Sequence, residues 1–408
     1  MLDVSLHGRH IGTLLKEPGT SVVSFVLEDD YMADRARPVL GQQFEDRTEH
    51  RVFRQARHPG RLPAFFANLL PEGALQAIVL SQRPEGDDAS ILAFVGEDLP
   101  GAVTVRPAEA GSPTAAAPAK TFDEPGLPTT PTGPEELRFS LAGVQLKFSA
   151  VRDPDQRFTL PFRGRNGGWI LKFGSQRYPM LPENELQTMQ WASRSGLVVP
   201  HNELVPVRSI GGLDPRFFDL GDNVFVIERY DRSPDGARIH QEDFAQVRGA
   251  LPEQKYSGAS YEGLARFVGD LCGQEDLVEL LRRVVFAILS GNTDAHLKNW
   301  SLVYPDRRTA RLSPAYDLVF VRYYLETDQL ALPLAKEKNP AKIGWEHITR
   351  VERFLRQHGH DLPVVTTLRA FVVRCLDEWQ TCKAACDPLY RERLDAHLAA
   401  LPLARDQP

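Results

Sequence analysis

Residues 292–319 read NTDAHLKNWSLVYPDRRTARLSPAYDLV, and the order of polar and apolar residues in this stretch gives the strongest indication of the fold. Asp294 and Asn299 stand in a D-x-x-x-x-N arrangement, two strand-like segments (WSLVY and TARLS) follow around a Pro-Asp turn, and Asp317 comes next. The pattern predicts a polar loop, a β-hairpin and a second acidic loop in close succession. The alternative is that these residues cap a helix or turn and end a strand, which is their commoner use.

The order of these three polar residues is the order that protein kinases use. In a kinase, an aspartate orients and deprotonates the substrate hydroxyl, an asparagine in the same loop binds Mg²⁺, and a later aspartate binds the metal again. Phosphoryl transfer depends on positioning and charge neutralisation more than on a reactive side chain, and Mg²⁺ prefers hard oxygen ligands. Asp294, Asn299 and Asp317 are therefore candidates for these three roles.

Upstream residues supply another part of such a site. Lys172 lies in the middle of a strand-like segment, GWILKFG, where alternation predicts an inward side chain, and Glu185 lies on the helical segment that follows, ENELQTMQWASRSG. A strand lysine that contacts ATP phosphates is held by a helical glutamate in kinases. Taken singly, either residue would more often face solvent. Together with residues 292–319, the pair favours a nucleotide site.

Two further segments would complete that site. In SLAGVQLKFSA, residues 140–150, a glycine and small residues would let backbone N–H groups approach phosphate, with Lys147 as an added cation, although the segment is neither a Walker sequence nor G-x-G-x-x-G. VFVIERYDR lies where a β-rich region gives way to an α-rich one, so the backbone from Glu228 to Tyr230 would form a hinge that holds adenine. His296 is structural or a nucleotide contact rather than a base, because Asp294 fills that role.

The patterns along the chain predict four segments. Residues 1–105 combine short β-type runs with a helical stretch, AFFANLLPEGALQAIVL, and predict a compact domain. Residues 106–134 are rich in Pro, Ala, Thr and Gly and predict an extended linker. Strand-like segments predict a β-rich lobe over 135–231, and helical patterns predict an all-helical lobe over 232–408. The predicted fold class is α+β, with a protein-kinase-like bilobal core after a small α+β N-terminal domain.

Composition narrows the class of protein. With 408 residues, 42% hydrophobic residues, 25% charged residues and a net charge of -6, the chain reads as an ordinary soluble protein. The net charge argues against a nucleic-acid footprint over the whole surface, but leaves a basic face or a basic partner open. The longest apolar run, near Val284 to Leu289, is too short to span a bilayer, and MLDVSLHGRH lacks the features of a secretory signal, so we expect a cytoplasmic protein.

The cysteines give no metal-binding pattern. Four occur in the chain, none of them in paired C-x-x-C spacing. We therefore expect free buried thiols in preference to a zinc site. The four positions are Cys272, Cys375, Cys382 and Cys386.

Several spaced motifs, in one order, closely resemble the HipA-type kinases. SLAGVQLK looks like the S-x-A-G-x-Q-x-K loop of that family, WILKF like its phosphate-lysine strand, ENELQTMQWA like its glutamate helix, and ERYDR like its hinge. NTDAHLKN and PAYDL resemble its catalytic and metal motifs. HGRHIGTL, LLPEG and GEDLPGAV resemble the smaller domain that precedes the kinase core. The resemblance covers nearly the whole chain.

The resemblance implies an ATP- and Mg²⁺-dependent serine/threonine protein kinase that acts as the toxin of a toxin-antitoxin pair. Asp294 would be the catalytic base, Asn299 and Asp317 the magnesium ligands, and Lys172 the phosphate-binding lysine, supported by Glu185. ATP would be bound by Ala142, Gly143, Val144, Gln145, Leu146, Lys147, Lys172, Glu228, Arg229, Tyr230, His296, Leu297, Lys298, Asn299, Tyr316 and Asp317.

The resemblance also implies regulation and partners. Ser140 falls on the position that such kinases autophosphorylate, where added phosphate would expel the loop from the nucleotide. The known targets of the family are aminoacyl-tRNA synthetases, and its usual inhibitor is a HipB-like DNA-binding antitoxin, through which the complex would reach DNA and regulate its own expression. Leu146 departs from the family, whose members often carry Glu there. We expect this departure to affect the dynamics of the loop and to leave its phosphate contacts possible.

Two other classes of function remain open on the sequence. A small-molecule phosphotransferase with a kinase-like core would share the catalytic motifs, and labelling of a metabolite with no labelled protein would favour it. A non-catalytic corepressor would hold a DNA-binding partner on an operator, and failure to bind ATP would favour that role. The intact set of catalytic residues argues against the corepressor as the sole function.

Overall fold

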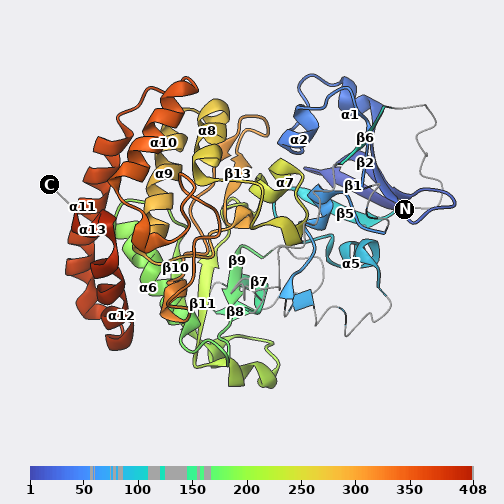
Figure 1. Ribbon diagram of the computed structural model, residues 1–408. Coiled ribbons are helices and arrows are strands. Elements are labelled where there is room, and N and C mark those ends of the chain that lie inside the picture. The colour runs from blue at the N-terminus through green and yellow to red at the C-terminus, as the bar shows by residue number, and fades with distance from the viewer. Residues whose placement is uncertain are drawn as a thin grey trace.

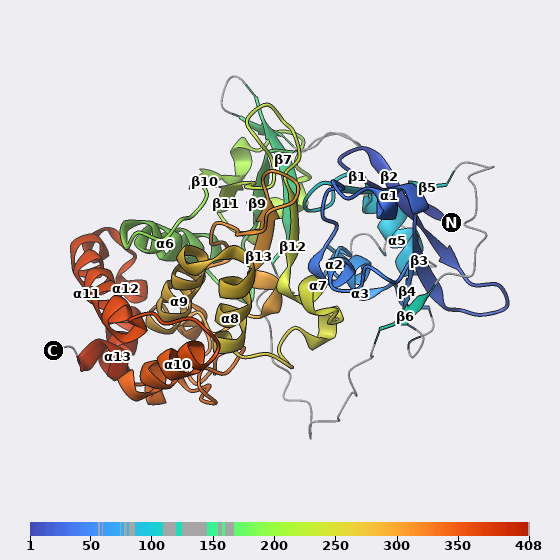
Figure 2. The ribbon, with the colours of Figure 1, turned by 90° about the horizontal axis from the view of Figure 1, so that it is seen from above.

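The computed structural model describes residues 1–55, 58, 60–73, 75–76, 80, 86–108, 120–124, 145–153, 157–159 and 167–406. Figure 1 shows three parts: an N-terminal domain with its own sheet, a lobe built on a second sheet, and a lobe formed mainly by helices. From above, the N-terminal domain lies at the opposite end of the molecule from the C-terminal helices (Figure 2). The α+β class and the kinase-like bilobal core predicted from the sequence are therefore confirmed.

The N-terminal domain is built on a six-stranded sheet with the order β5-β1-β2-β3-β4-β6. Buried phenylalanines pack edge to face beneath the sheet, with ring centroids 4.7 Å apart for Phe25 and Phe66 and 4.8 Å apart for Phe44 and Phe53. These contacts form a core separate from those of the two lobes. The strands are β1 Leu2–Leu6, β2 Arg9–Lys16, β3 Val23–Leu27, β4 Val52–Arg54, β5 Val103–Pro107 and β6 Thr121–Asp123, and the helices α1 Asp29–Ala33, α2 Gln42–Glu45, α3 Ala64–Ala67 and α5 Asp88–Val95.

Strand β6 corrects the prediction of an extended linker over 106–134. Residues 121–123 pair in parallel with β4, opposite Val52 to Arg54. The buried Glu124 carboxylate then accepts a hydrogen bond from the Ala64 N–H (2.9 Å) and another from the Gln55 side chain. A three-residue strand with one aromatic residue is too short to show periodicity, so the surrounding composition concealed it. Residues 109–119 and 125–134 lie outside the described part of the chain.

The N-terminal lobe of the core carries a five-stranded antiparallel sheet with the order β10-β11-β9-β7-β8. Alternating apolar side chains of these strands form a small core that contains Leu171, Phe173, Val224 and Val226. The predicted helix is present as α6, Leu181–Arg194, and it packs on β10 and β11. The strands are β7 Lys147–Arg152, β8 Phe158–Thr159, β9 Trp169–Lys172, β10 Asn202–Pro206 and β11 Asn223–Glu228.

The C-terminal lobe is mostly helical. The prediction from the sequence that it is all-helical is wrong. A three-stranded sheet, β12-β13-β14, lies in it, and the predicted hairpin forms β13 and β14 with Leu302 opposite Leu312. The apolar run near Val284 is buried and forms the C-terminal part of α9. The strands are β12 His240–Asp243, β13 Ser301–Tyr304 and β14 Arg311–Leu312, and the helices α7 Phe244–Arg248, α8 Tyr261–Cys272, α9 Gln274–Leu289, α10 Trp345–Gln357, α11 Val364–Cys382, α12 Pro388–Ala400 and α13 Pro402–Arg405.

Two predictions from composition concern the helices and the cysteines. Among the described residues, no helix combines the length and apolar character that crossing a membrane requires. All four cysteines are free thiols. Cys375 is buried as predicted, whereas Cys272, Cys382 and Cys386 are only partly buried.

Candidate active site

The β13–β14 hairpin brings the two polar loops of residues 292–319 to one cavity. Asp294 and Asn299 precede β13, and Asp317 follows β14, so that pairing of the two strands sets the loops side by side. The Asn292 side chain ties them together by donating a hydrogen bond to the Asp317 carbonyl oxygen (3.3 Å). The cavity is lined by Gln145, Leu181, Asn292, Asp294, Asn299, Asp317, Val319 and Val321.

Asp317 lies among the charged and polar groups of this cavity and contacts several of them. Its backbone is left-handed, with φ +58°. One carboxylate oxygen accepts from Lys172 Nζ (2.6 Å) and the other from Asn299 Nδ2 (2.6 Å). Burial alone would raise the pKa of Asp317, but the ammonium groups of Lys172 and Lys147 outweigh it and hold that pKa well below its ordinary value. The group is an anion throughout the physiological range.

Lys172 also binds the glutamate that the sequence had placed beside it. Lys172 is the last residue of β9, not a mid-strand residue, and its side chain is buried. Its ammonium group lies 2.5 Å from the Glu185 carboxylate, which α6 carries into a site with no solvent exposure. Burial raises the pKa of Glu185 to about 7, although the Lys172 charge acts in the opposite direction. One lysine thus joins a strand, a helix and the second acidic loop.

Asp294 is oriented by a residue that the sequence analysis did not single out. The Tyr256 hydroxyl donates a hydrogen bond to Asp294 Oδ1 (2.7 Å). The Tyr256 ring also packs edge to face on His296, with centroids 5.1 Å apart. Tyr256 belongs to the loop between α7 and α8, about forty residues before the motif, so only the folded chain reveals the contact. Asn292, which lines the cavity, was missed as well.

His296 is buried and uncharged. Burial lowers the pKa of His296 to about 3, and the nearby Lys255 ammonium acts in the same direction. Neither ring nitrogen has a hydrogen-bond partner among the described residues. Its backbone N–H donates to the Asn299 side-chain oxygen (3.1 Å). A buried neutral imidazole with both nitrogens unpartnered suits the contact with a polar ligand that was predicted for it, and not a role as base.

The predicted phosphate loop is only partly described. Ser140, Ala142, Gly143 and Val144 lie outside the described residues. Gln145 lines the cavity, and Lys147 begins β7 opposite Lys172. Leu146 corrects the prediction for that position, because its side chain packs in the core of the N-terminal lobe and does not line the cavity. An apolar residue there is therefore explained by packing.

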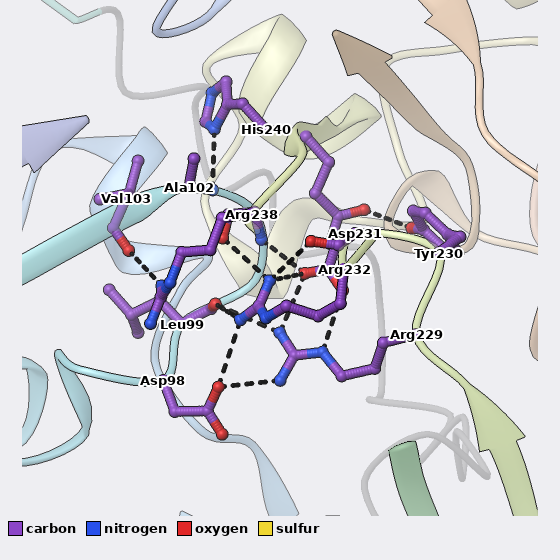
Figure 3. A network of polar contacts seen from close by, with 12 residues as sticks. Asp98, Leu99, Ala102, Val103, Arg229, Tyr230, Asp231, Arg232, Arg238 and His240 are labelled. Atoms are coloured by element: carbon purple, nitrogen blue, oxygen red, sulfur yellow. Dashed lines mark hydrogen bonds and ion pairs between the residues drawn. The ribbon is translucent and has the colours of Figure 1, made fainter. Parts of the chain in front are cut away.

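The predicted hinge has a different role in part. The Glu228 and Arg229 N–H groups donate to the carbonyls of His201 (2.9 Å) and Gly168 (2.8 Å), so neither amide is available to adenine. The Arg229 side chain turns away into a polar network with Asp98 and Asp231 (Figure 3). The expectation that Arg229 lines the nucleotide is therefore wrong for both its amide and its guanidinium group.

Tyr230 and Tyr316 pack on each other, and neither is among the residues that line the cavity. Their ring centroids lie 5.6 Å apart, and the Tyr316 hydroxyl donates to the Lys298 carbonyl oxygen (2.9 Å). The Lys298 ammonium group pairs with Glu72 (2.7 Å), and Lys298 is not among the residues that line the cavity. The Leu297 side chain is fully buried in the core of the C-terminal lobe. For Leu297, only the backbone remains as a possible contact.

The donor set fits a nucleotide with Mg²⁺. The Asp317 carboxylate and the Asn299 amide oxygen are hard oxygen ligands of the kind that Mg²⁺ takes. Asn299 now presents its NH₂ group to Asp317, so the amide would turn to offer its oxygen. Gln145 Nε2 and the His296 ring nitrogens are buried without partners in the described part of the chain, as expected where a polar ligand binds.

Comparison with known proteins agrees with this geometry. The family model described as HipA N-terminal domain matches residues 2–106, and the HipA-like C-terminal domain model matches residues 139–379. The chain belongs to the HipA family. The resemblance inferred from the motifs is thus confirmed. The N-terminal model covers the domain that has its own hydrophobic core, and the C-terminal model covers residues of both lobes.

Several known proteins resemble the chain over most of its length. A protein of Sinorhizobium fredii, Y4dM, provisionally named a kinase, is 36% identical over 100% of this chain and 98% of its own length. The serine/threonine-protein kinase toxin HipA of Shewanella oneidensis is 27% identical over 69% of each chain. The solved complex of HipA, HipB and operator DNA from the same organism matches with a TM-score of 0.72 at 20% identity, covering 97% of this chain and 96% of that one. This structural likeness supports the fold.

Proposed function

We propose that this HipA-family protein is a serine/threonine protein kinase that uses ATP and Mg²⁺. The observation that carries the proposal is the cluster in which the buried Lys172 contacts both the buried Glu185 (2.5 Å) and the partly exposed Asp317 (2.6 Å), and Asp317 contacts Asn299 (2.6 Å). Asp294 lines the same cavity. Two carboxylates, an amide and a lysine from four separate elements form the arrangement that phosphoryl transfer requires.

Each residue has a distinct part in the proposed reaction. Asp294, held by the Tyr256 hydroxyl, accepts the proton of the serine or threonine hydroxyl as that oxygen attacks the γ-phosphorus of ATP, the bond to the β,γ-bridging oxygen breaks and ADP leaves. Lys172 directs positive charge at the phosphates, with Glu185 fixing its side chain. Asn299 and Asp317 provide the oxygens that hold the metal. Bound Mg²⁺ would supply neutralisation of the charge that develops on the transferring group.

The finer assignments are part of the same proposal. We assign the chain as the toxin of a toxin-antitoxin pair in the cytoplasm, with a HipB-like antitoxin as inhibitor and contact with DNA through that antitoxin. The supporting observation is that the Shewanella relative with the same fold was solved with HipB and its operator DNA. We assign an aminoacyl-tRNA synthetase as the phosphorylated protein and Ser140 as the autophosphorylation site, by family resemblance.

Labelling of a cell lysate tests this function. Wild-type protein is incubated with γ-labelled ATP, Mg²⁺ and lysate, and labelled proteins are resolved beside the labelled small molecules. We expect labelled protein with the wild type and none with Asp294→Asn. Asp361→Asn serves as control, because Asp361 is exposed in the loop between α10 and α11. Full labelling by Asp294→Asn contradicts the proposal, and a labelled metabolite without labelled protein identifies a small-molecule phosphotransferase.

A further inference from the structure

The N-terminal domain reaches into the catalytic loop of the kinase core. The segment after α3 contains Asn68 and Glu72, and both meet Lys298, which lies between Asp294 and Asn299 in the chain. Lys298 Nζ donates to the Asn68 carbonyl oxygen (2.8 Å) and lies 2.7 Å from Glu72 Oε1. The Asn68 side chain also donates to the Ala250 carbonyl oxygen (2.8 Å) in the C-terminal lobe. The domain therefore contacts a loop that the proposed chemistry uses directly.

Glu72 bridges two lysines of the core. Its second carboxylate oxygen accepts a hydrogen bond from Lys255 Nζ (2.8 Å), and Lys255 is buried. Burial raises the pKa of Glu72, but the charges of Lys298 and Lys255 outweigh it and lower that pKa to about 2. Glu72 is therefore ionised at physiological pH. Without this carboxylate, two ammonium groups would face each other with less compensation, and repulsion would separate them.

Both lysines belong to the structure that holds the catalytic loop. The Lys255 carbonyl oxygen accepts from the Leu297 N–H (3.1 Å), in the middle of that loop. The next residue, Tyr256, holds Asp294 through its hydroxyl (2.7 Å). Lys298 precedes Asn299 directly. Fixing the two lysines thus fixes the loop at three places, between the proposed base and a proposed metal ligand.

A second contact holds the N-terminal domain in register on the core. In Figure 3, Asp98 accepts hydrogen bonds from Arg229 (2.9 Å) and Arg232 (3.2 Å), both of which are buried at the hinge. The Gly101 N–H donates to the Asp231 carboxylate (2.7 Å). Gly101 has φ +74°, and a Cβ there would lie 2.8 Å from a backbone nitrogen of β12, so the loop approaches as only glycine allows.

The buried charges of this hinge contact contribute more to the placement of the N-terminal domain on the core than to the strength of its binding there. Desolvation of paired charges offsets most of their attraction, whereas a shifted register would remove Asp98 from two buried arginines and leave Asp231 as their shared carboxylate partner. The contact therefore selects one placement of the domain. In that placement Glu72 faces Lys255 and Lys298.

We propose that Glu72 is a positioning residue of the kinase, supplied by the N-terminal domain, which holds the catalytic loop through Lys298 and Lys255. The proposal rests on the kinase function proposed above for its catalytic consequence. It gives the N-terminal domain a part in catalysis through the loop it touches, and Glu72 itself contacts none of the reacting atoms.

The test compares wild type with Glu72→Gln, in which the carboxylate is replaced at nearly unchanged volume. Glu253→Gln is the matched control, because Glu253 forms an exposed ion pair between the same domain and the same lobe, with Arg61 (3.1 Å). Hydrogen exchange of the backbone amides of residues 293–300 is measured by mass spectrometry, and protection of α9 reports that each variant is folded. Steady-state kinetics with ATP are measured on the same samples.

We expect the amides of residues 293–300 to exchange roughly tenfold faster in Glu72→Gln, with α9 and the control unchanged. The kcat should fall roughly tenfold while the KM for ATP stays within about twofold, since only loop geometry is altered. Unchanged exchange in Glu72→Gln overturns the proposal, and so does a raised kcat, which would make Glu72 a restraint. A wild type without phosphate transfer refutes the kinase function, whereas the exchange result still decides the role of Glu72.

Discussion

The Lys172 ammonium group lies 2.6 Å from the Asp317 carboxylate, although the two residues are 145 positions apart in the chain. Lys172 ends a strand of the N-terminal lobe and Asp317 follows the hairpin of the C-terminal lobe, so this ion pair closes the two lobes on each other. The pair also puts the positively charged Lys172 ammonium group beside the carboxylate that we propose as a metal ligand. Both the activity and the stability of the protein should depend on contacts of this kind.

Replacing Lys172 should abolish phosphate transfer and lower stability. In Lys172→Met the fully buried Glu185 carboxylate loses its partner, which typically costs about 3–5 kcal/mol unless the carboxylate takes up a proton, and the partly exposed Asp317 loses the same partner. We expect a clear fall in the free energy of unfolding, measured by urea denaturation, and at least about a hundredfold loss of kcat/KM. The double variant Lys172→Met with Glu185→Leu should regain stability without activity. Unchanged unfolding in Lys172→Met would refute the buried ion pair.

Removing the Tyr256 hydroxyl should slow the reaction without weakening ATP binding. Tyr256→Phe keeps the ring contact with His296 and removes only the hydrogen bond to Asp294. We expect kcat to fall by about tenfold to a hundredfold, in line with about 1.5–3 kcal/mol for one hydrogen bond to a charged group, and the KM for ATP to stay constant. Steady-state kinetics distinguish the two. A raised KM with unchanged kcat would place Tyr256 in nucleotide binding.

Asp98 should stabilise the docking of the N-terminal domain. In Asp98→Ala, the buried Arg229 and Arg232 each lose a carboxylate partner, and we expect a loss of about 2–4 kcal/mol in the free energy of unfolding. Glu97→Gln is the control, because the adjacent Glu97 pairs with the exposed Arg106, which is worth little. Chemical denaturation measures both. Equal stability of the two variants would show that the hinge network does not hold the domain.

The buried Glu242 should make stability fall as the pH rises. Burial raises the pKa of Glu242 to about 8, above its ordinary value of 4.5, so folding favours the protonated form. Its stabilising effect is complete below about pH 4.5 and is lost as the pH rises through 8. Between pH 6.5 and 8 the buried histidines act in the opposite direction, because burial lowers their pKa values in the fold while the unfolded chain still binds protons near pH 6.5, so the carboxyl is isolated by comparing wild type with Glu242→Gln.

The contribution of Glu242 is the difference between wild type and Glu242→Gln in the slope of the free energy of unfolding against pH. In this window Glu242 contributes at most about 1.4 kcal/mol of lost stability per pH unit. Glu242→Gln should reduce the fall, with Glu124 and Glu185, whose pKa values burial raises to about 7, accounting for a remainder. Thermal denaturation at several pH values measures the slopes. Identical slopes in the two proteins would show that Glu242 is ionised in the fold.

The sequence predicted those parts of the site that local order and spacing determine. The hairpin after Asn299, the helix that carries Glu185 and the helical run through Val284 all have periodicity or turn residues that mark them. The family motifs indicated the kinase core and the domain before it. Strand β6 lacked such a signal because three residues do not form a pattern.

Long-range contacts account for what the sequence did not predict. Tyr256 and Glu72 carry no motif that links them to residues 292–299, and only packing of the α7–α8 loop and of the N-terminal domain brings them there. ERYDR was read as a hinge from its position, yet its Arg229 pairs with an aspartate 131 residues earlier. A buried arginine cannot be assigned to one of many carboxylates from sequence spacing alone.

Magnesium dependence of phosphate transfer tests the central claim most directly. Wild type and Asp317→Asn are incubated with γ-labelled ATP and lysate protein over a series of Mg²⁺ concentrations, and the phosphorylated residues are identified by mass spectrometry. The account predicts phosphoserine or phosphothreonine with the wild type, which disappears when EDTA removes the metal and is absent with Asp317→Asn at every Mg²⁺ concentration. Equal transfer by Asp317→Asn, or transfer that persists in EDTA, would contradict it.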